Sequence, residues 1–246
     1  MSDSFSTAVV TGASRGFGRA IATALVAAGT DVVGVARDEH DLQAVRTELG
    51  ERFTPVAADA TGEALAQDLI RTHRPGLLVL NAGATPHMAP VHEQTWETFS
   101  RNWHVDTRHA FTWIKAALRE PLAPGSVVVA MSSGAALAGS PLSGGYASAK
   151  AAIRYLRGYG ADQSERAGLG IRFVALFPDL TPTTGLGAAG VAGYAAWQGI
   201  DEDTFVERRQ PILTPEHVAK AVLAVAADAD STAEYQVRGS GMHALQ

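Results

Sequence analysis

Two side chains that can move a proton, and one that can hold an oxygen atom, lie close together in the sequence. Tyr146 and Lys150 are four residues apart, a spacing that puts both side chains on one face of a helix. An ammonium group near a phenol favours the phenolate, so Tyr146 becomes usable as a general acid or base. Ser133 stands thirteen residues before the tyrosine, after the apolar run Val127–Val129, and can hold the reacting oxygen. Together these residues predict proton transfer at an oxygen atom.

A glycine-rich stretch, TGASRGFG at Thr11–Gly18, lies between the apolar run Ala8–Val10 and the helical pattern Ile21–Ala28. Its glycines let the backbone turn tightly and approach a ligand, and the start of the next helix offers N–H groups to a pyrophosphate. An ordinary strand-to-helix turn would also use such glycines. We interpret the motif as a dinucleotide site.

Short β-branched runs alternate with longer helical patterns along the chain. The runs are Thr7–Val10, Asp31–Val35, Phe53–Ala57, Leu77–Leu80, Ser126–Ala130, Ile171–Leu176 and Tyr235–Val237. This alternation predicts an α/β fold, a single-domain, Rossmann-like, doubly wound parallel sheet of about seven strands with helices on both faces. Ligands of such sheets bind at the carboxyl ends of the strands.

No linker or repeat divides residues 1–246, so we expect one dinucleotide-binding and catalytic domain. A Gly- and Ala-rich segment at about 183–210 carries Tyr194 and Trp197. It is either a loosely packed pair of surface helices or a mobile lid over the substrate, and we expect the lid.

Composition excludes several classes of function. The net charge of −5 argues against nucleic acid as a partner, and the absence of cysteine excludes disulfides, thiolate catalysis and cysteine-bound zinc. No apolar run approaches the roughly 18 residues of a membrane span, and the first residues carry no basic or apolar leader. We therefore expect a cytoplasmic protein with no membrane partner.

The glycine turn, the serine and the Tyr-Lys pair together resemble the short-chain dehydrogenase/reductase family, of the ordinary single-domain type, from Thr7 to about Gly241. The resemblance implies an oxidoreductase that interconverts a carbonyl and a secondary alcohol by hydride transfer, with Ser133, Tyr146 and Lys150 as catalytic residues. It also implies that Asn81-Ala82-Gly83 lines the cofactor and stabilises the sheet. The implied cofactor-binding residues are Gly12, Ser14, Arg15, Gly16, Phe17, Gly18, Arg37, Asp59, Ala60, Asn81, Ala82, Gly83, Tyr146, Lys150, Pro178 and Thr183.

Three of these positions have more specific implied roles. Asp59 meets the adenine amine, although it could also cap a helix. Pro178 begins the family's PG element, and Thr183 falls where a threonine touches the nicotinamide side.

Two residues depart from the family's pattern. Asp106 stands where the family has a fourth catalytic residue, an asparagine whose backbone carbonyl holds a water that leads to the lysine. A carbonyl does not depend on the side chain, so we expect Asp106 to serve in the same way. The asparagine side chain of the family also donates to backbone, which an ionised Asp cannot do, so either Asp106 is protonated or the helix is adjusted locally. An ionised Asp106 beside Lys150 is the alternative to the backbone role. Asp179 replaces the glycine of the PG element and is expected to reshape the pocket floor.

The charge pattern favours NADP(H) over NAD(H). The acidic residue that would bind the ribose hydroxyls of NAD is missing at Val35-Ala36-Arg37, whereas Arg15 and Arg37 could both reach a 2′-phosphate.

Four further expectations concern partners and alternatives. We expect a hydrophobic carbonyl or alcohol substrate and no metal, because the spacings of the histidines match no zinc pattern and a helical surface explains them; these are His87, His92, His104 and His109. Apolar and aromatic residues on the expected helices 95–119 and 143–166 predict a homodimer or homotetramer. The alternative function is a catalytically weak or inactive cofactor-binding sensor of the same fold, motivated by Asp106 and Asp179.

Overall fold

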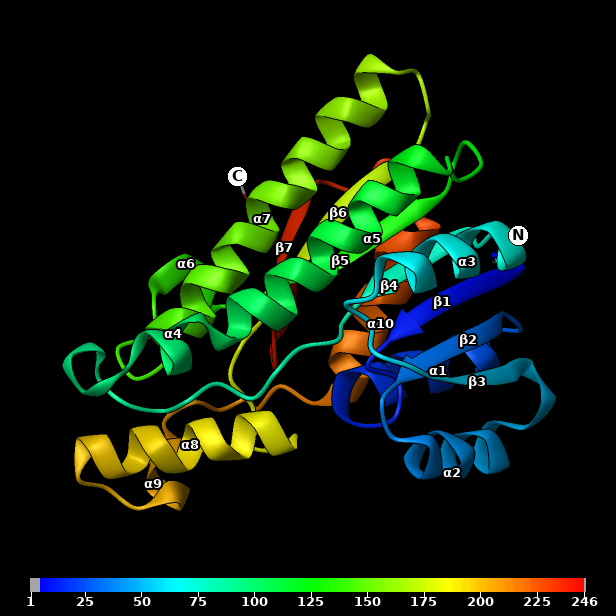
Figure 1. Cartoon of the computed structure of the whole chain (residues 1–246). Helices are drawn as coiled ribbons and strands as arrows, with labels where there is room; N and C mark the ends of the chain where they lie inside the picture. Colours follow the sequence, from blue (N-terminus) through cyan, green and yellow to red (C-terminus); the bar gives the residue numbers. More distant parts are fainter. Residues whose placement is uncertain (1–4, 246) are drawn as a thin grey trace.

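The computed structural model describes residues 5–245, and a single sheet of eight strands runs through this part of the chain (Figure 1). The first seven strands are parallel and the last pairs antiparallel with the seventh. The strands are β1 (Thr7–Thr11), β2 (Asp31–Ala36), β3 (Phe53–Ala57), β4 (Leu77–Leu80), β5 (Val127–Met131), β6 (Arg172–Pro178), β7 (Glu234–Arg238) and β8 (Gly241–Ala244). The predicted α/β fold is thus confirmed, and β8 is the strand that the sequence did not predict.

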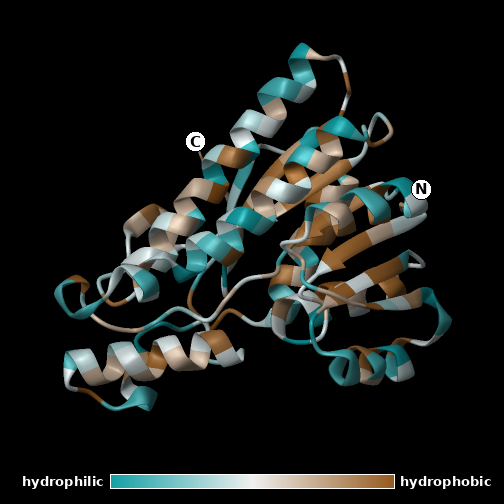
Figure 2. Cartoon of the chain, viewed as in Figure 1, coloured by the Kyte–Doolittle hydropathy of each residue, from teal (hydrophilic) through white to brown (hydrophobic). Residues whose placement is uncertain are grey.

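Helices cover both faces of the sheet because neighbouring residues of a strand point to opposite sides. Val10 of β1 packs with Ile21 and Val222 on one face, whereas Val9 packs with Ile70 and Trp113 on the other. In Figure 2 most strands at the centre of the sheet are strongly hydrophobic, β7 is largely hydrophilic, and the helices are mixed. The helices are α1 (Gly16–Ala27), α2 (Glu39–Leu49), α3 (Glu63–His73), α4 (Trp96–Asn102), α5 (Arg108–Arg119), α6 (Ala135–Ala138), α7 (Gly144–Arg166), α8 (Gly185–Gln198), α9 (Glu202–Glu207) and α10 (Pro215–Ala227).

The strand order is β3-β2-β1-β4-β5-β6-β7-β8. The chain winds outward in one direction from β1 and in the other from β4, so the loops that follow these two strands diverge and leave a crevice. The glycine-rich turn follows β1, and Asn81-Ala82-Gly83 follows β4.

The long helix expected over residues 95–119 is interrupted. A π-helical segment, Trp103–Thr107, separates α4 from α5 and contains the buried Asp106. Such widened turns are frequent at functional sites because they redirect a side chain.

The segment expected as a lid forms α8 and α9. Their apolar residues, Val191, Ala195 and Phe205, make a small cluster apart from the two large cores on the faces of the sheet. In Figure 1 these two helices lie beyond the carboxyl end of the sheet, below α4. Within residues 5–245, no helix combines the length and the apolar character that crossing a membrane requires.

Candidate active site

The glycine-rich turn has the geometry of a phosphate cradle. Gly12 and Gly16 have φ angles of +67° and +53°, a region that side chains disfavour. Helix α1 begins at Gly16, and no side chain caps the N–H groups of its first turn. Gly18 has another role, because a Cβ there would lie 2.1 Å from the Gly12 carbonyl oxygen. It allows α1 to pack closely against the turn.

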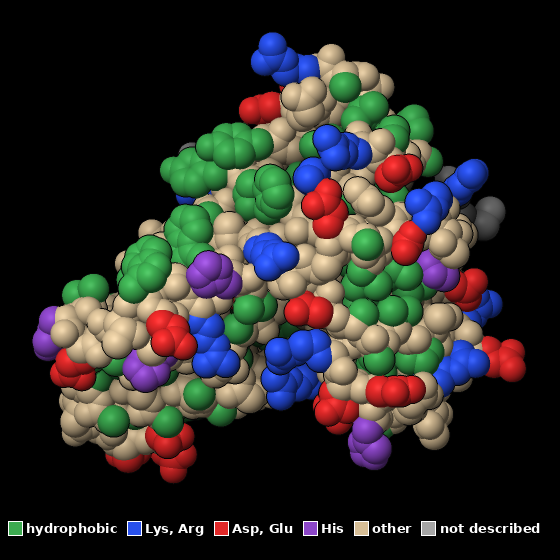
Figure 3. All heavy atoms as spheres, in the orientation of Figure 1, with side chains coloured by type: hydrophobic (Ala, Val, Ile, Leu, Met, Phe, Trp, Pro, Cys, Tyr) green, Lys and Arg blue, Asp and Glu red, His purple; other side chains and the backbone are tan. Residues whose placement is uncertain are grey.

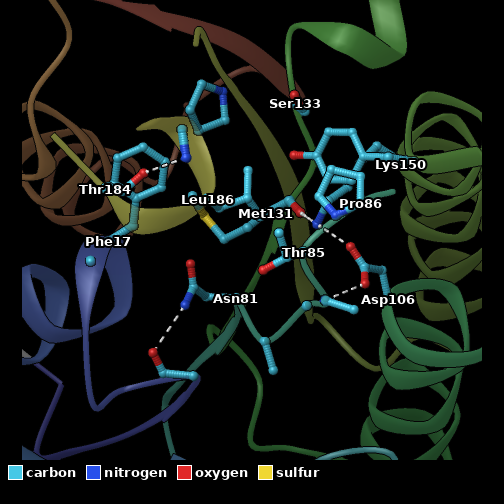
Figure 4. Close-up of a pocket in the computed structure, with 18 of the residues that line it drawn as sticks. Phe17, Asn81, Thr85, Pro86, Asp106, Met131, Ser133, Lys150, Thr184 and Leu186 are labelled. Carbon is cyan, nitrogen blue, oxygen red and sulfur yellow. Dashed lines mark hydrogen bonds and ion pairs between the residues drawn. The ribbon is translucent and has the colours of Figure 1, made fainter. Parts of the chain in front are cut away.

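Asn81 fastens this turn to the end of β4. Its amide Nδ2 donates to the carbonyl oxygen of Thr11 at 3.0 Å (Figure 4). In return, the Thr11 hydroxyl accepts hydrogen bonds from the backbone N–H groups of Asn81, at 2.9 Å, and Ala82, at 3.1 Å. These bonds hold the two sides of the crevice in register.

Ser133, Tyr146 and Lys150 line the same cavity. Ser133 follows β5, and its Oγ accepts a hydrogen bond from the Ala135 N–H at 3.2 Å. Helix α7 carries the other two on one face, with Lys150 Nζ 5.6 Å from the centre of the Tyr146 ring. Lys150 is buried, and its Nζ donates to the Met131 carbonyl at 3.1 Å. The lysine is therefore fixed between α7 and the end of β5.

The Asp106 side chain is the fourth member of the group that contains Ser133, Tyr146 and Lys150. Its Oδ2 lies 3.2 Å from Lys150 Nζ, an ion pair that is not aligned as a hydrogen bond (Figure 4). Its Oδ1 accepts from the Ala84 N–H at 2.8 Å and from Asn102 Nδ2 at 3.3 Å. A Cβ at Gly83 would lie 2.8 Å from Oδ2, so only glycine leaves room for the carboxylate.

These contacts favour the alternative in which an ionised Asp106 acts through its side chain. Burial disfavours the charged form of Lys150, but the Asp106 carboxylate, with Tyr146, outweighs burial and raises the pKa of the lysine. The carboxylate accepts from two N–H donors and faces the ammonium, so its side chain is fully engaged in the site. Our expectation that the backbone alone serves at position 106 does not account for this ion pair.

His109 is buried beside the same group. Burial, together with the positive charge of Lys150, lowers the pKa of His109 to about 3, so the imidazole is neutral at pH 7. The expectation that a helical surface explains all four histidines is therefore wrong for His109, because α5 turns it toward the sheet.

The cavity has a volume of about 1150 Å³ and extends from the glycine-rich turn to α8. That volume exceeds a typical small-molecule pocket of roughly 300–1,000 Å³ and leaves room for a dinucleotide and a substrate. Two of the predicted cofactor residues, Gly18 and Thr183, do not line it. Thr184 lines the cavity in place of Thr183 and caps α8 through a hydrogen bond from the Gly187 N–H at 3.1 Å.

The other predicted residues are brought together as expected from the topology. Those that line the cavity are Gly12, Ser14, Arg15, Gly16, Phe17, Arg37, Asp59, Ala60, Asn81, Ala82, Gly83, Asp106, Ser133, Tyr146, Lys150 and Pro178. The residues that the sequence interpretation missed come from distant segments, and they include Ser140, Thr181 and Gln236. Tyr194 and Arg209 line the cavity from the segment expected as a lid, although no individual role was predicted for them.

Arg37 and Asp59 mark one end of the cavity, after β2 and β3. The Thr61 N–H donates to Asp59 Oδ1 at 2.9 Å, and this bond, with Arg37 nearby, holds the pKa of Asp59 below its usual value. Asp59 does not cap α3, whose N-cap is Gly62. Its carboxylate remains a hydrogen-bond acceptor at the cavity wall.

Comparison with known proteins identifies the family. The family model described as short chain dehydrogenase matches residues 6–190. The chain is 33% identical over 235 residues to a cis-4-hydroxycyclohexanecarboxylate dehydrogenase of Sinomonas cyclohexanicum, covering 91% of this chain and 90% of that one. It is 29% identical over 202 residues to a sorbitol dehydrogenase of Cereibacter sphaeroides, covering 79% and 73%. The protein therefore belongs to the short-chain dehydrogenase/reductase family of oxidoreductases.

The fold agrees with that of a solved family structure. A crystal structure of an NAD+-bound xylitol dehydrogenase superposes with a TM-score of 0.83 at 21% identity, covering 94% of this chain and 96% of that one. The names of these relatives are those of enzymes, which does not favour the alternative of an inactive sensor.

Proposed function

We propose that the protein is an NADP(H)-dependent oxidoreductase that interconverts a carbonyl and a secondary alcohol. The observation that carries the proposal is the convergence of Ser133, Tyr146 and the buried Lys150 on one cavity that also contains the glycine-rich turn. The uncapped start of α1 and the positive-φ glycines fit a pyrophosphate, so the residues present fit a dinucleotide.

The nicotinamide cofactor supplies the hydride when it is bound. Ser133 donates a hydrogen bond to the reacting oxygen, and Tyr146 gives its proton to the oxygen as negative charge develops there. Lys150 stabilises the tyrosinate that remains, and Asp106 keeps the lysine charged and in place. In the oxidation direction, Tyr146 takes the proton from the alcohol.

The preference for NADP(H) over NAD(H) rests on Arg15 and Arg37. Both are exposed and line the cavity after β1 and β2, where a ribose 2′-phosphate would meet paired guanidinium donors. The nearest carboxylate along the chain, Asp38, caps α2 by accepting from the Asp41 N–H at 3.0 Å.

The proposal includes three statements about the whole protein. We infer that α8 and α9 act as a substrate lid, that the chain forms a homodimer or homotetramer, and that it works in the cytoplasm with a small-molecule substrate. The aromatic residues exposed on α5 and α7 support the second statement.

Oxidation of NADPH against a panel of ketones, quinones and oxo acids tests the activity. We expect turnover of at least one ketone with NADPH and a lower kcat/KM with NADH. Absence of turnover in both directions with both cofactors, in a protein that binds NADPH, would support the sensor.

A further inference from the structure

The end of the cavity beyond Ser133 has a polar wall. Asp179, Gln236 and Arg209 line it. Asp179 lies next to the loop that contains Ser133 and Gly134, since a Cβ at Gly134 would be 2.9 Å from its Oδ1. Asp179 and its partner Gln236 are therefore close to Ser133, and Arg209 lines the same cavity. Our expectation of a hydrophobic substrate does not account for these polar side chains.

Arg209 is held in place by an aromatic stack. Its guanidinium carbon lies 3.6 Å from the centre of the Phe205 ring, and Phe205 is fully buried. Phe205 stacks in turn on Tyr194, with ring centres 6.3 Å apart and planes 9° apart. The Tyr194 hydroxyl bonds to that of Ser140, in the loop before α7. A chain of contacts thus connects the guanidinium with α9, α8 and the loop before α7 that contains Ser140.

The hydrogen-bond donors of Arg209 are largely unused within residues 5–245. Its Nη1 makes one long contact, 3.4 Å, to the Phe205 carbonyl. Asp179 is engaged elsewhere, because its Oδ1 accepts from Gln236 Nε2 at 2.8 Å and its Oδ2 lies 3.7 Å from Arg238 Nε. Asp179 thus bonds to Gln236 and pairs with Arg238, and within residues 5–245 no carboxylate lies within ion-pair distance of Arg209. Figure 3 shows that Lys and Arg side chains are scattered over this side of the molecule among acidic ones.

Arg209 is exposed overall, so its guanidinium is open to an anion that enters the cavity. Burial lowers the pKa of Arg209, whereas Asp179 and Tyr194 act to raise it. A guanidinium remains charged at neutral pH in either case. A guanidinium with free donors pairs well with a carboxylate, which it can bind through two parallel hydrogen bonds.

We propose that Arg209 binds a carboxylate of the substrate, so that the natural substrate is an oxo acid or hydroxy acid with an apolar body. The apolar body would contact Pro86, Met88 and Leu180 on the cavity wall. This inference rests on the proposed oxidoreductase function. Arg15 and Arg37, at the other end of the cavity, remain for the cofactor's phosphate.

A pair of ketones that differ only in charge tests the inference. The probes are 4-oxocyclohexanecarboxylate and its methyl ester, each reduced with NADPH by the unmodified protein, by Arg209→Met and by Arg208→Met. Methionine keeps much of the apolar stem on Phe205 and removes the charge. Arg208 is the matched control, an exposed neighbour that does not line the cavity.

We expect the unmodified protein and Arg208→Met to prefer the acid over the ester in kcat/KM. In Arg209→Met, the ratio of acid to ester falls by about tenfold or more, mostly through KM. Higher ionic strength should lower the same ratio in the unmodified protein.

Three results would overturn the inference. The first is an unchanged acid-to-ester ratio in Arg209→Met, and the second is an equal change of that ratio in Arg208→Met. The third is a loss of NADPH affinity in Arg209→Met as large as the loss of kcat/KM for the acid, which would place Arg209 at the cofactor. If neither ketone turns over, calorimetry measures whether the acid binds to the protein in the presence of NADP+. Binding that is lost in Arg209→Met supports the inference. Binding that is unchanged in Arg209→Met, or no binding to the unmodified protein, refutes it. Failure of turnover alone counts against the proposed function, because the calorimetric measurement does not require catalysis.

Discussion

At the scale of single residues, the proposed function assigns to Tyr146 the proton transfer and little of the binding. Replacing Tyr146 with Phe removes the hydroxyl and keeps the ring that lies over Lys150. We expect kcat to fall below a few per cent of its value, with NADPH affinity changed less than about threefold. Single-turnover rates and fluorescence titration with NADPH measure the two quantities. Retention of substantial activity would remove Tyr146 from its role as general acid.

Asp106 sets the electrostatics of the lysine. Asp106→Asn removes the carboxylate that raises the pKa of Lys150, so that pKa falls toward the value that burial alone would give. As long as Lys150 remains charged, its ammonium stabilises the tyrosinate without the opposing negative charge of the Asp106 carboxylate. The rising limb of the pH–rate profile for alcohol oxidation should therefore move to lower pH by about one unit, which corresponds to roughly 1.4 kcal/mol.

Asp162→Asn is the matched control for this measurement, because Asp162 is exposed on α7, the helix that carries Lys150. A profile that stays within a few tenths of a unit in Asp106→Asn would restore the interpretation in which only the backbone of residue 106 serves.

Arg37 should govern the choice of cofactor. Arg37→Asp removes a cation and puts a carboxylate at the cavity wall, where it repels a 2′-phosphate and can accept from ribose hydroxyls. We expect the ratio of kcat/KM for NADPH to that for NADH to fall by at least tenfold. An unchanged ratio would show that the 2′-position is read elsewhere.

Residues close in sequence were easier to predict than residues that meet only in the fold. The Tyr-Lys pair lies on one helix, and the glycine-rich turn is continuous, so both have a local signal. Arg209 follows α9 and Gln236 lies on β7, and no spacing rule connects them with Ser133. The contact between Asp106 and Lys150 depends on a π-helical turn that the hydrophobic pattern does not encode.

At the scale of elements, a buried ion-pair cluster joins α7 to β7. Glu234 accepts from Arg154 Nε at 2.8 Å and from Arg157 Nη2 at 2.6 Å, and its side chain is only 10% exposed. Burial alone would raise the pKa of Glu234, but the hydrogen bonds from the two arginines outweigh it and lower the pKa. A lowered pKa in the folded state means that the cluster stabilises the fold above about pH 5 and ceases to do so as the pH falls through that pKa.

Glu234→Gln should lower the free energy of unfolding by about 1–3 kcal/mol at pH 7, because it leaves two guanidinium groups without a charged partner. The difference from the unmodified protein should shrink at pH 4. Urea unfolding at the two pH values measures it, with Glu165→Gln, an exposed glutamate of α7, as the control. An equal difference at both pH values would mean that packing, rather than charge, joins α7 to β7.

The elements themselves differ in how much the sequence reveals of them. Strands buried on both faces are continuous apolar runs, so β1, β4 and β5 are plain in the sequence. Strand β8 is half exposed and contains Gly241 and His243, and it forms because β7 offers a free edge. Its signal comes from pairing, which the sequence pattern alone does not carry.

At the scale of the whole molecule, aromatic side chains gather on one outer face, over α5 and α7 (Figure 3). Trp103, Phe111, Tyr155 and Tyr159 are 42%, 50%, 64% and 64% exposed. They surround a shallow apolar hollow of about 480 Å³. An exposed apolar patch of this kind is typical of an interface between subunits, and helices that present the same face in two copies can close a symmetric dimer.

Light scattering at micromolar concentration should therefore give a mass of two or four times the 25.7 kDa of the chain. The double variant Phe111→Glu, Tyr155→Glu puts charges at the centre of the aromatic face, where two copies would bring four carboxylates together at the cost of their hydration. We expect its mass to fall to that of a smaller assembly, with the far-ultraviolet circular dichroism unchanged, because both residues are exposed in the single chain. Val91→Glu, at a 71% exposed residue away from this face, should leave the mass unchanged. A single-chain mass for the unmodified protein would refute the assembly, and an unchanged mass for the double variant would place the interface on another face.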